Sequence, residues 1–234
     1  MSSQSPQTRR MIYWKNRWAA GKTEFHKTNV HQMLNKHLDK LIPEGKANKI
    51  FFPLCGKAVD MKWLADKGFT VVGVDGVSSA LQDFYTEQGL ESTVEDVTKA
   101  GKNIKVYKSP DDEIKLYCCD IMDFTREFEG TVDAVWDRGS LVALNREDVA
   151  EYVQVIKNIL SPQGRILLEV VEYDVSIMAD VEGPTKPPPP YPMYEEEVKK
   201  LYEPECTVQF VERNPFQFAG KGIHAINYLI IRKF

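Results

Sequence analysis

The feature that most constrains this chain is an alternation of short, strongly apolar runs with longer amphipathic segments. The apolar runs have the length of single buried strands and lie at residues 49–54, 70–75, 114–120, 131–137 and 165–172. Apolar residues recur at helical spacing between them, at 58–67, 78–88 and 146–160. Strands that alternate with helices favour an α/β fold, in which a mostly parallel sheet carries helices on both faces.

The remaining segments are less regular. The spacing of apolar residues predicts an amphipathic helix over 25–42 and another helix near 194–203. The polar middle segment yields only a short strand at 104–107. Two strands near the C-terminus, at 207–213 and 225–232, have no helical pattern between them, so we expect them to pair antiparallel. One reversed strand would then close an otherwise parallel sheet.

The bulk composition narrows the class of protein. A chain of 234 residues, of which 43% are hydrophobic, fits a single domain over 1–234, with a flexible polar tail at 1–12. A net charge of −4 offers no basic stripe for nucleic acid, and no apolar run is long enough to span a bilayer. The four cysteines form no C-x-x-C pair, the histidines lack metal-ligand spacing, and the N-terminus lacks a secretory signal. We therefore expect a cytoplasmic, metal-free monomer that acts on a small molecule.

In a sheet of this kind, ligands bind outside the carboxyl ends of the strands. The first strand ends in Pro-Leu-Cys-Gly-Lys, where Gly56 allows the backbone to approach a ligand closely. The G-x-G-x-x-G pattern of dinucleotide sites is absent, which argues against a nicotinamide-dependent oxidoreductase. S-adenosylmethionine carries no pyrophosphate and needs fewer glycines. An ordinary strand-to-helix turn would have the same pattern.

Two aspartates follow the next strands of the predicted sheet. Asp75 lies 19 residues after Gly56, where nucleotide-binding folds hold ribose hydroxyls with an acidic side chain, although Asp-Gly is also turn chemistry. Asp120 follows the third strand. Its carboxylate can accept a hydrogen bond from an adenine amino group, with Ile121 beside it, or it can cap the next helix.

A charged pair follows the fourth strand. Asp137 and Arg138 precede a glycine, at the edge of the sheet where catalytic residues of such folds gather. Asp137 would hold the methionine amino group or a substrate proton, and Arg138 would hold an anion. The alternative is a structural ion pair that caps the strand.

Several longer motifs carry a resemblance to a known family. They are W-x-x-x-W-x-x-G-K-T-x-F-H at 14–26, F-F-P-L-C-G-K-A-V-D-M-K-W at 51–63, V-V-G-V-D, L-Y-C-C-D and W-D-R-G-S-L-V-A-L. The chain closely resembles thiopurine S-methyltransferases from about residue 13 to 144 and more loosely beyond. The resemblance implies a Rossmann-like, seven-stranded sheet with one antiparallel strand. It also implies S-methylation of small aromatic or heterocyclic thiols, with S-adenosylmethionine as cofactor and S-adenosylhomocysteine as product.

The resemblance also implies a set of site residues. By position, the cofactor residues are Trp14, Trp18, Leu54, Asp75, Asp120, Ile121 and Arg138. Lys22, Thr23 and Phe25 fall in the motif that lies over the cofactor, and Phe25 also contacts substrate. Animal members carry Glu at position 75 and Ser at position 120, which are hydrogen-bond acceptors as well. Without the resemblance, the three aromatic residues would be interpreted as a core stripe.

Methyl transfer from a sulfonium is an in-line displacement by a thiolate, so alignment matters more than strong base catalysis. We expect Asp137 and Arg138 to steady the substrate, and the proline-rich loop 183–192 to border its pocket. Two alternatives remain open. A related enzyme of the same fold would methylate halide, sulfide or selenium species, and a silent module would bind cofactor without turnover.

Overall fold

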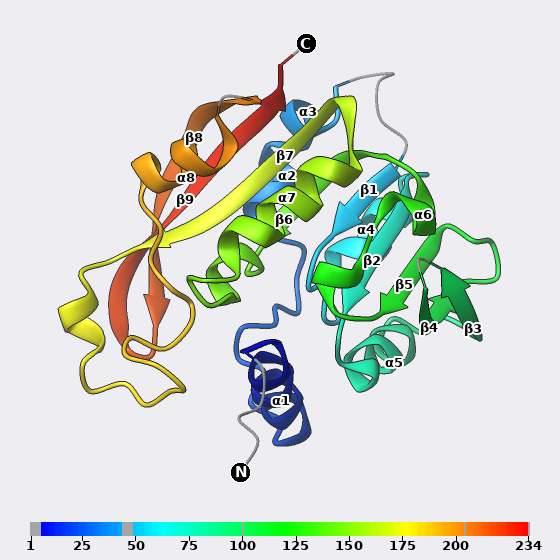
Figure 1. Ribbon diagram of the computed structural model, residues 1–234, viewed down its shortest axis with the longest axis horizontal. Coiled ribbons are helices and arrows are strands. Elements are labelled where there is room, and N and C mark those ends of the chain that lie inside the picture. The colour runs from blue at the N-terminus through cyan, green and yellow to red at the C-terminus, as the bar shows by residue number, and fades with distance from the viewer. Residues whose placement is uncertain (1–5, 44–48, 100, 204, 234) are drawn as a thin grey trace.

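The computed structural model describes residues 6–43, 49–99, 101–203 and 205–233. Within this part of the chain, nine strands form a single sheet in the order β3-β4-β5-β2-β1-β6-β7-β9-β8 (Figure 1). The strands are β1 Lys49–Phe52, β2 Thr70–Asp75, β3 Thr93–Lys99, β4 Lys102–Lys108, β5 Ile114–Cys118, β6 Val132–Arg138, β7 Leu160–Glu172, β8 Cys206–Phe218 and β9 Lys221–Arg232.

Helices lie on both faces of this sheet and beyond its carboxyl edge. They are α1 Pro6–Ala19, α2 Gln32–Lys36, α3 Leu38–Leu41, α4 Asp60–Ala65, α5 Ser78–Glu87, α6 Arg126–Glu129, α7 Val149–Ile159 and α8 Glu195–Tyr202, with 3-10 turns η1 Ile121–Asp123, η2 Leu141–Ala143 and η3 Val175–Met178. One apolar core lies between the sheet and α2 to α5, and a second lies between the sheet and α6 to α8. The expected three-layer arrangement is therefore present.

The centre of the sheet is parallel. β5, β2, β1, β6 and β7 pair in parallel, and nearly every residue of β2 is buried because both faces of the strand are covered. The expected strand at 70–75 has the same bounds in the structure. The expectation of an α/β fold with a mainly parallel core holds for these five strands.

The expected number of seven strands, with one antiparallel, is wrong. An antiparallel hairpin flanks the parallel core on each side, β3–β4 at one edge and β9–β8 at the other. β3 is almost wholly exposed and pairs with β4 along its whole length, with ion pairs from Lys105 to Asp96 at 3.1 Å and from Lys108 to Glu95 at 2.6 Å across the two strands. Since this hairpin is not built on an apolar run, hydrophobic periodicity indicated only 104–107.

The C-terminal hairpin is longer than expected. β8 and β9 are joined by the two residues Ala219 and Gly220, with φ of 49° and 74°, the left-handed pair of a tight hairpin turn. In Figure 1 this hairpin lies beside β7 and ends near the loop that follows β7. The hairpin tip thereby reaches the carboxyl ends of the parallel strands.

The N-terminal third differs from the expected helix over 25–42. Only α2 and α3 are helical there, and 24–31 is an irregular segment. Residues 6–12, expected to belong to a flexible tail, are part of α1. α1 lies apart from the layered core in Figure 1, at the side where the parallel strands end.

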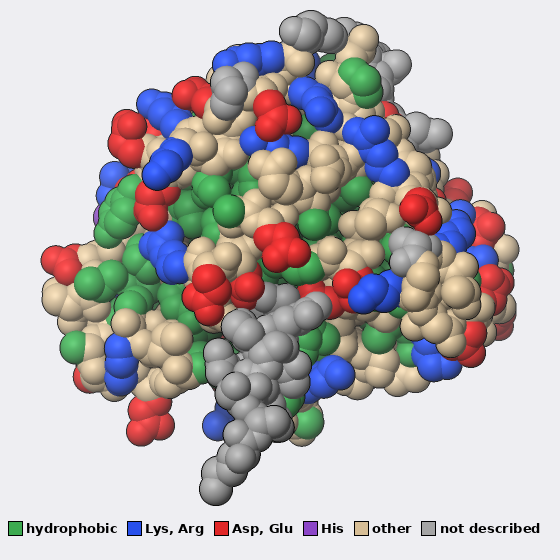
Figure 2. Space-filling view, viewed as in Figure 1, with side chains coloured by type: hydrophobic (Ala, Val, Ile, Leu, Met, Phe, Trp, Pro, Cys, Tyr) green, Lys and Arg blue, Asp and Glu red, His purple; other side chains and the backbone are tan. Residues whose placement is uncertain are grey.

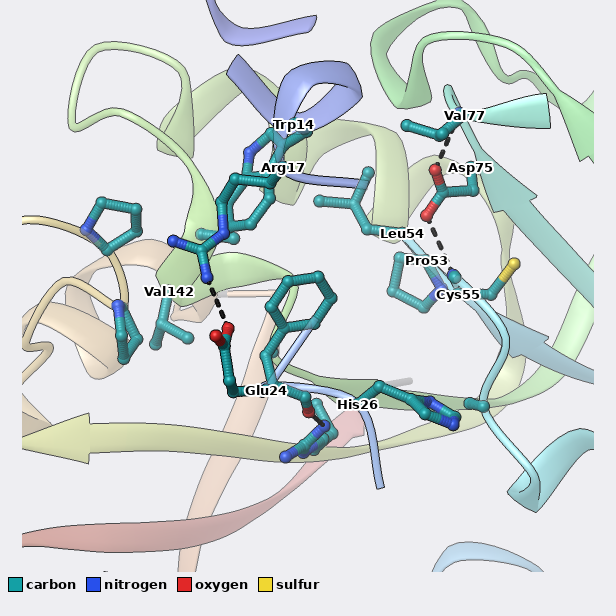
Figure 3. Close-up of a pocket in the computed structure, with 18 of the residues that line it drawn as sticks. Trp14, Arg17, Glu24, His26, Pro53, Leu54, Cys55, Asp75, Val77 and Val142 are labelled. Carbon is teal, nitrogen blue, oxygen red and sulfur yellow. Dashed lines mark hydrogen bonds and ion pairs between the residues drawn. The ribbon is translucent and has the colours of Figure 1, made fainter. Parts of the chain in front are cut away.

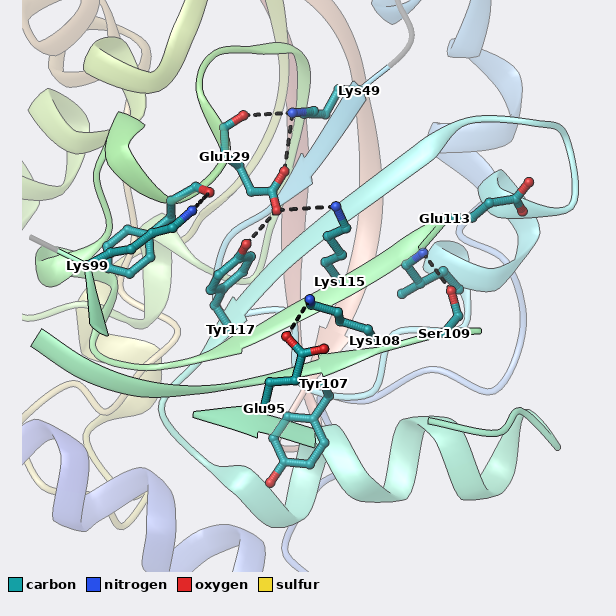
Figure 4. Close-up of polar contacts among 12 residues, drawn as sticks. Lys49, Glu95, Lys99, Tyr107, Lys108, Ser109, Glu113, Lys115, Tyr117 and Glu129 are labelled. Atoms are coloured by element: carbon teal, nitrogen blue, oxygen red, sulfur yellow. Dashed lines mark hydrogen bonds and ion pairs between the residues drawn. The ribbon is translucent and has the colours of Figure 1, made fainter. Parts of the chain in front are cut away.

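The amino ends of the central strands are fastened by a polar network around Glu129 (Figure 4). Its carboxylate accepts a hydrogen bond from the Tyr117 hydroxyl at 2.5 Å and lies 3.2 Å from the Lys49 ammonium and 3.7 Å from that of Lys115. Because β1, β5 and α6 meet at this carboxylate, the amino edge is held by side chains. The opposite edge contains a cavity.

The surface shows no segregation of charge on the face seen in Figure 2, where acidic and basic side chains are interspersed. Among the helices of the described residues, none has the length and apolar character that crossing a membrane requires.

Candidate active site

A cavity of about 540 Å³ opens at the carboxyl ends of the parallel strands. Its walls come from the ends of β1, β2, β5, β6 and β7, from α1 and the segment after it, from the proline-rich loop and from the β8–β9 hairpin. This is where ligands bind in α/β folds. The volume suits a ligand of nucleoside size together with a second small molecule.

The turn after β1 has an unusual backbone. Leu54 has a φ of 42° and Gly56 a φ of 49°, and the Cys55 N–H donates to the Val74 carbonyl at 2.9 Å. A left-handed backbone conformation is energetically costly for leucine. Such strain is typical of functional sites, so it marks this turn as a candidate binding element. A Cβ at Gly56 would lie 3.0 Å from the Trp18 ring, so glycine is needed for this close approach.

Asp75 ends β2 directly beside this turn. Its two carboxylate oxygens accept hydrogen bonds from the Gly56 N–H and the Val77 N–H, each at 2.9 Å (Figure 3). Burial raises the pKa of Asp75 to about 6, and these backbone hydrogen bonds counteract the rise. Each oxygen keeps a further lone pair, so Asp75 both shapes the turn and lines the cavity.

Asp120 follows β5 and also lines the cavity. One of its oxygens accepts a hydrogen bond from the Met122 N–H at 3.0 Å, so the residue caps the short η1 turn as one of the two expectations had it. Ile121 is buried next to it and lines the same wall. A cap and a ligand contact are compatible, because a carboxylate offers several acceptor positions.

Three aromatic residues cover this wall from the N-terminal side. Trp14 and Trp18 lie on α1, and the ring of each meets that of Phe25 edge to face, at 5.6 and 5.7 Å between centroids. All three line the cavity, and Phe25 keeps 36% of its surface exposed. An ion pair between Arg17 and Glu24, 2.8 Å long, ties the helix to the segment after it (Figure 3). The stripe therefore lies over a cavity and not within a core.

Arg138 ends β6 and is engaged on two sides. Its Nη1 donates to the Phe25 carbonyl at 2.8 Å, and its Nε lies 3.6 Å from Oε1 of Glu169 on β7. The other Glu169 oxygen lies 3.6 Å from Nε2 of His31. Burial, followed by the charges of Arg138 and Lys27, lowers the pKa of His31 to about 4, so the imidazole is uncharged at neutral pH.

Asp137 does not line the cavity. It is fully buried, accepting a hydrogen bond from the Tyr152 hydroxyl at 2.8 Å and a long one from the Leu141 N–H at 3.3 Å. Burial raises its pKa to about 6. The geometry thus places the expected catalytic carboxylate outside the cavity wall, in a structural position. Its partners are Tyr152 and Leu141, whereas Arg138 pairs with Glu169, so the arrangement differs from the alternative of an Asp137–Arg138 ion pair.

Lys22 and Thr23, expected in the cover over the cofactor, are also absent from the cavity wall. They form the turn after α1, where the Lys22 carbonyl accepts from Arg17 Nε at 3.1 Å and the Thr23 carbonyl accepts from the His26 N–H at 2.8 Å. Their backbone presents Phe25 to the cavity.

The sequence patterns missed two groups of wall residues. Glu169, His31 and Asp60 meet at the end of the cavity under β6 and β7, and the tip of the β8–β9 hairpin adds Phe216 and Phe218. Glu169 carries a signal that periodicity ignores, since it is a charged residue inside the apolar run 166–171. The hairpin residues carry none, because their place depends on the length of β8, which is mostly exposed, and of β9, which it pairs with. Within the described residues, no cluster of three or more His, Cys, Asp or Glu side chains is arranged to hold a metal ion.

Comparison with known proteins places these features in a family. Residues 10–222 match the family model described as thiopurine S-methyltransferase. The chain is 41% identical over 201 residues to the thiopurine S-methyltransferase of Bos taurus, covering 86% of this chain and 78% of the relative. It is 37% identical to a probable thiopurine S-methyltransferase of Danio rerio, covering 91% and 88%.

Solved structures share the fold at low sequence identity. A Burkholderia thailandensis 1,6-didemethyltoxoflavin-N1-methyltransferase, with its substrate and S-adenosylhomocysteine bound, aligns with a TM-score of 0.64 at 15% identity, covering 100% of this chain and 93% of that one. A SAM-dependent methyltransferase from Anabaena variabilis aligns with a TM-score of 0.65 at 16% identity, covering 95% of each. These likenesses show a methyltransferase fold.

Proposed function

Because the chain belongs to the thiopurine S-methyltransferase family, we propose that it transfers the methyl group of S-adenosylmethionine to small aromatic or heterocyclic thiols. The observation that carries the proposal is the cavity at the carboxyl ends of the strands, which combines acidic strand ends with an aromatic cover. The tip of the β8–β9 hairpin adds Phe216 and Phe218 to the wall, and these rings favour an aromatic acceptor over a halide or sulfide ion.

The residues present fit S-adenosylmethionine. Asp75 and Asp120 stand at the ends of neighbouring strands, suited to hydroxyl and amino donors. The backbone at Gly56 is free of a side chain. A sulfonium cation is attracted to aromatic faces, which Trp14, Trp18 and Phe25 supply. When bound, the cofactor supplies an electrophilic methyl group.

The order of strands divides the cavity into two halves. We call the walls from β5, β2 and β1 the cofactor half; they contain Leu54, Gly56, Asp75, Asp120 and Ile121. We call the walls from β6, β7 and the β8–β9 hairpin the acceptor half; they contain Arg138, Glu169, Phe216 and Phe218, with His31 beside them. Phe25 lies between the halves and holds the acceptor ring by edge or face contact.

Within this division, the side chains of the protein align the acceptor with the methyl group and shield both from water. Arg138 fixes Phe25 through its carbonyl, at 2.8 Å, and places a positive charge next to the acceptor. The aromatic cover excludes water from the reacting atoms. Asp137 supports the turn after β6 from within the core. Alignment of nucleophile and methyl group is the main requirement of an in-line displacement.

Two accessory proposals accompany the activity. A cytoplasmic location is supported by the four cysteines, which are all free thiols. A monomer is supported by the scatter of the large exposed apolar side chains over separate elements; among the described residues these are Ile12, Phe25, Val94, Val175, Tyr194 and Phe210. Light scattering coupled to size-exclusion chromatography tests the oligomeric state.

The activity is tested by calorimetric titration with S-adenosylhomocysteine, followed by a methyl-transfer assay on an aryl thiol. We expect binding and turnover. Binding without turnover on thiols, but with turnover on halide, sulfide or selenium species, would redirect the proposal to those acceptors. Binding without any turnover would identify a silent module, and absence of binding would refute the assignment of the cofactor half.

A further inference from the structure

The acceptor half contains a carboxylate that nothing described so far uses. Glu169 lies near the carboxyl end of β7, between Arg138 on β6 and Asn227 on β9 in the strand register, and its side chain is 12% exposed. It is a wall residue of the cavity. A carboxylate placed inside an apolar strand and facing a ligand cavity calls for a chemical explanation.

The hydrogen-bonding capacity of Glu169 is not taken up by its cationic or imidazole neighbours. Arg138 Nε and His31 Nε2 each lie 3.6 Å from one of its oxygens, which is contact distance but longer than a hydrogen bond. An ionised carboxylate offers about four acceptor positions. Positions on Glu169 therefore remain for a hydrogen from a molecule in the cavity.

The groups around Glu169 set its affinity for a proton. Burial raises its pKa, while the charge of Arg138 and then a hydrogen bond from the Asn227 side chain lower it; the charge of Lys27 lowers it further and that of Asp60 raises it. His31 adds no positive charge, because its own pKa is lowered to about 4. Burial outweighs the cations, so Glu169 holds a proton more readily than an exposed glutamate does.

Other acidic groups near the cavity are less suited to this role. The Asp60 carboxylate already accepts the His31 N–H at 2.6 Å, and Asp137 lies in the core. Asp75 belongs to the cofactor half. Uncharged His31, with its Nδ1 buried and without a hydrogen-bond partner within the described part of the chain, orders the segment beside Glu169 but is too weak a base to compete.

We propose that Glu169 is the general base that removes the proton from a neutral thiol acceptor, which extends the acceptors to weakly acidic thiols such as alkyl thiols. The inference rests on the proposed function. The S–H bond breaks with its electrons left on sulfur, and an O–H bond forms on Glu169. The sulfur lone pair then forms the S–CH₃ bond as the bond from methyl to the sulfonium breaks, and that electron pair leaves with S-adenosylhomocysteine. Glu169 returns its proton to solvent as product departs.

The test compares two thiols in Glu169→Gln, which keeps the shape of the side chain and removes the base. With an alkyl thiol, mostly protonated at neutral pH because its pKa is about 8.5, we expect kcat/KM to fall about 100-fold or more. With a nitro-substituted aryl thiol, already ionised, we expect a change of less than about threefold. The pH profile for the alkyl thiol should move to higher pH in the variant.

Matched variants separate catalysis from structure. Glu172→Gln removes a carboxylate from the same strand that pairs with Arg213 at 3.3 Å outside the cavity, and it should leave both thiols unaffected. Glu169→Asp keeps a carboxylate and should recover part of the alkyl-thiol activity. Affinity for S-adenosylhomocysteine reports whether Glu169→Gln is folded.

A second readout does not depend on turnover. An aryl thiol bound with S-adenosylhomocysteine, at a pH below the thiol's own pKa, should show thiolate absorbance in the wild-type complex and lose it in Glu169→Gln. Equal losses on both thiols, or no loss on either, would overturn the base while leaving the proposed function intact. No turnover of either thiol by the wild-type chain would overturn both.

Discussion

The two halves of the cavity are built from different parts of the chain. In the cofactor half, contacts are local: Asp75 accepts from backbone N–H groups 2 and 19 residues away, and a glycine turn leaves the main chain bare. In the acceptor half, contacts join side chains that are far apart in sequence, as when Arg138 reaches the Phe25 carbonyl 113 residues away. The first half depends on backbone conformation and the second on tertiary convergence, so substitutions in them should affect different measurements.

Replacing Asp75 should give the largest effect and should be confined to the cofactor half. In Asp75→Asn, an amide NH₂ must face one of the two backbone N–H groups that the carboxylate now accepts. We expect affinity for S-adenosylhomocysteine, measured by calorimetry, to fall about 30- to 150-fold, or about 2–3 kcal/mol. Asp66→Asn, which loses only an exposed pair with Lys62, serves as control. If the KM for the acceptor rose by the same factor, the division of the cavity into two halves would be wrong.

Removing the Tyr152 hydroxyl should test whether Asp137 belongs to either half. Tyr152→Phe leaves a fully buried carboxylate with one donor fewer, so the free energy of unfolding should fall by about 1–3 kcal/mol. Because Asp137 lies in the core, kcat/KM should stay within about twofold. Urea unfolding and steady-state kinetics check the two expectations. A large loss of activity at unchanged stability would restore a catalytic role to Asp137.

Acidification should weaken the cofactor half through Asp75. The pKa of this carboxyl is raised to about 6, and its ionised form is the one able to accept from hydroxyl groups of the cofactor. As pH falls through this value the acceptor is lost, so affinity for S-adenosylhomocysteine should be about tenfold weaker at about pH 5 than at neutral pH. Calorimetry across this range should give a flatter profile for Asp75→Asn; a profile identical to the wild type would assign the titration to another group.

Two glycine substitutions should give the smallest effect and should test the contact between the Gly56 turn and Trp18. Gly56→Ala and Gly89→Ala both place an alanine at positive φ, 49° and 64°, which costs about 1–2 kcal/mol of stability. A Cβ at Gly56 also meets the Trp18 ring at 3.0 Å, whereas nothing lies within 4 Å at Gly89. Only Gly56→Ala should weaken S-adenosylhomocysteine binding, by about fivefold or about 1 kcal/mol. Equal binding by both variants would show that the contact between Gly56 and Trp18 does not affect cofactor binding.

The cofactor half could be predicted from the sequence because its information is local. A continuous apolar run sets β2, the next polar residue is Asp75, and the spacing to Gly56 follows from one strand–helix–strand unit. The same logic places Asp120 and Ile121 at the end of β5. The helix expected over 25–42 was wrong over its first part. Residues 24–31 are irregular and run along the cavity, and the spacing of apolar residues does not distinguish such a segment from a helix.

The acceptor half could not be predicted in the same way. Glu169 meets Arg138 only through the register of β6 and β7, and meets His31 only because the irregular segment crosses the strand ends. β3 was missed for a related reason, since this exposed strand has no apolar run and is defined by its pairing with β4, of which only 104–107 was predicted. The family resemblance identified Arg138 and Phe25 as site residues, but it gave no reason to choose Glu169.

The β8–β9 hairpin stands at the edge of the sheet, and its two-residue turn allows changes that the parallel strands do not tolerate. Its tip places Phe216 and Phe218 in the wall of the acceptor half. A few codon changes there can alter which acceptors fit, while the strands that hold the cofactor are inherited intact. Diversification of acceptor range within a lineage can thus begin at this hairpin, without first passing through variants that have lost the methyl donor.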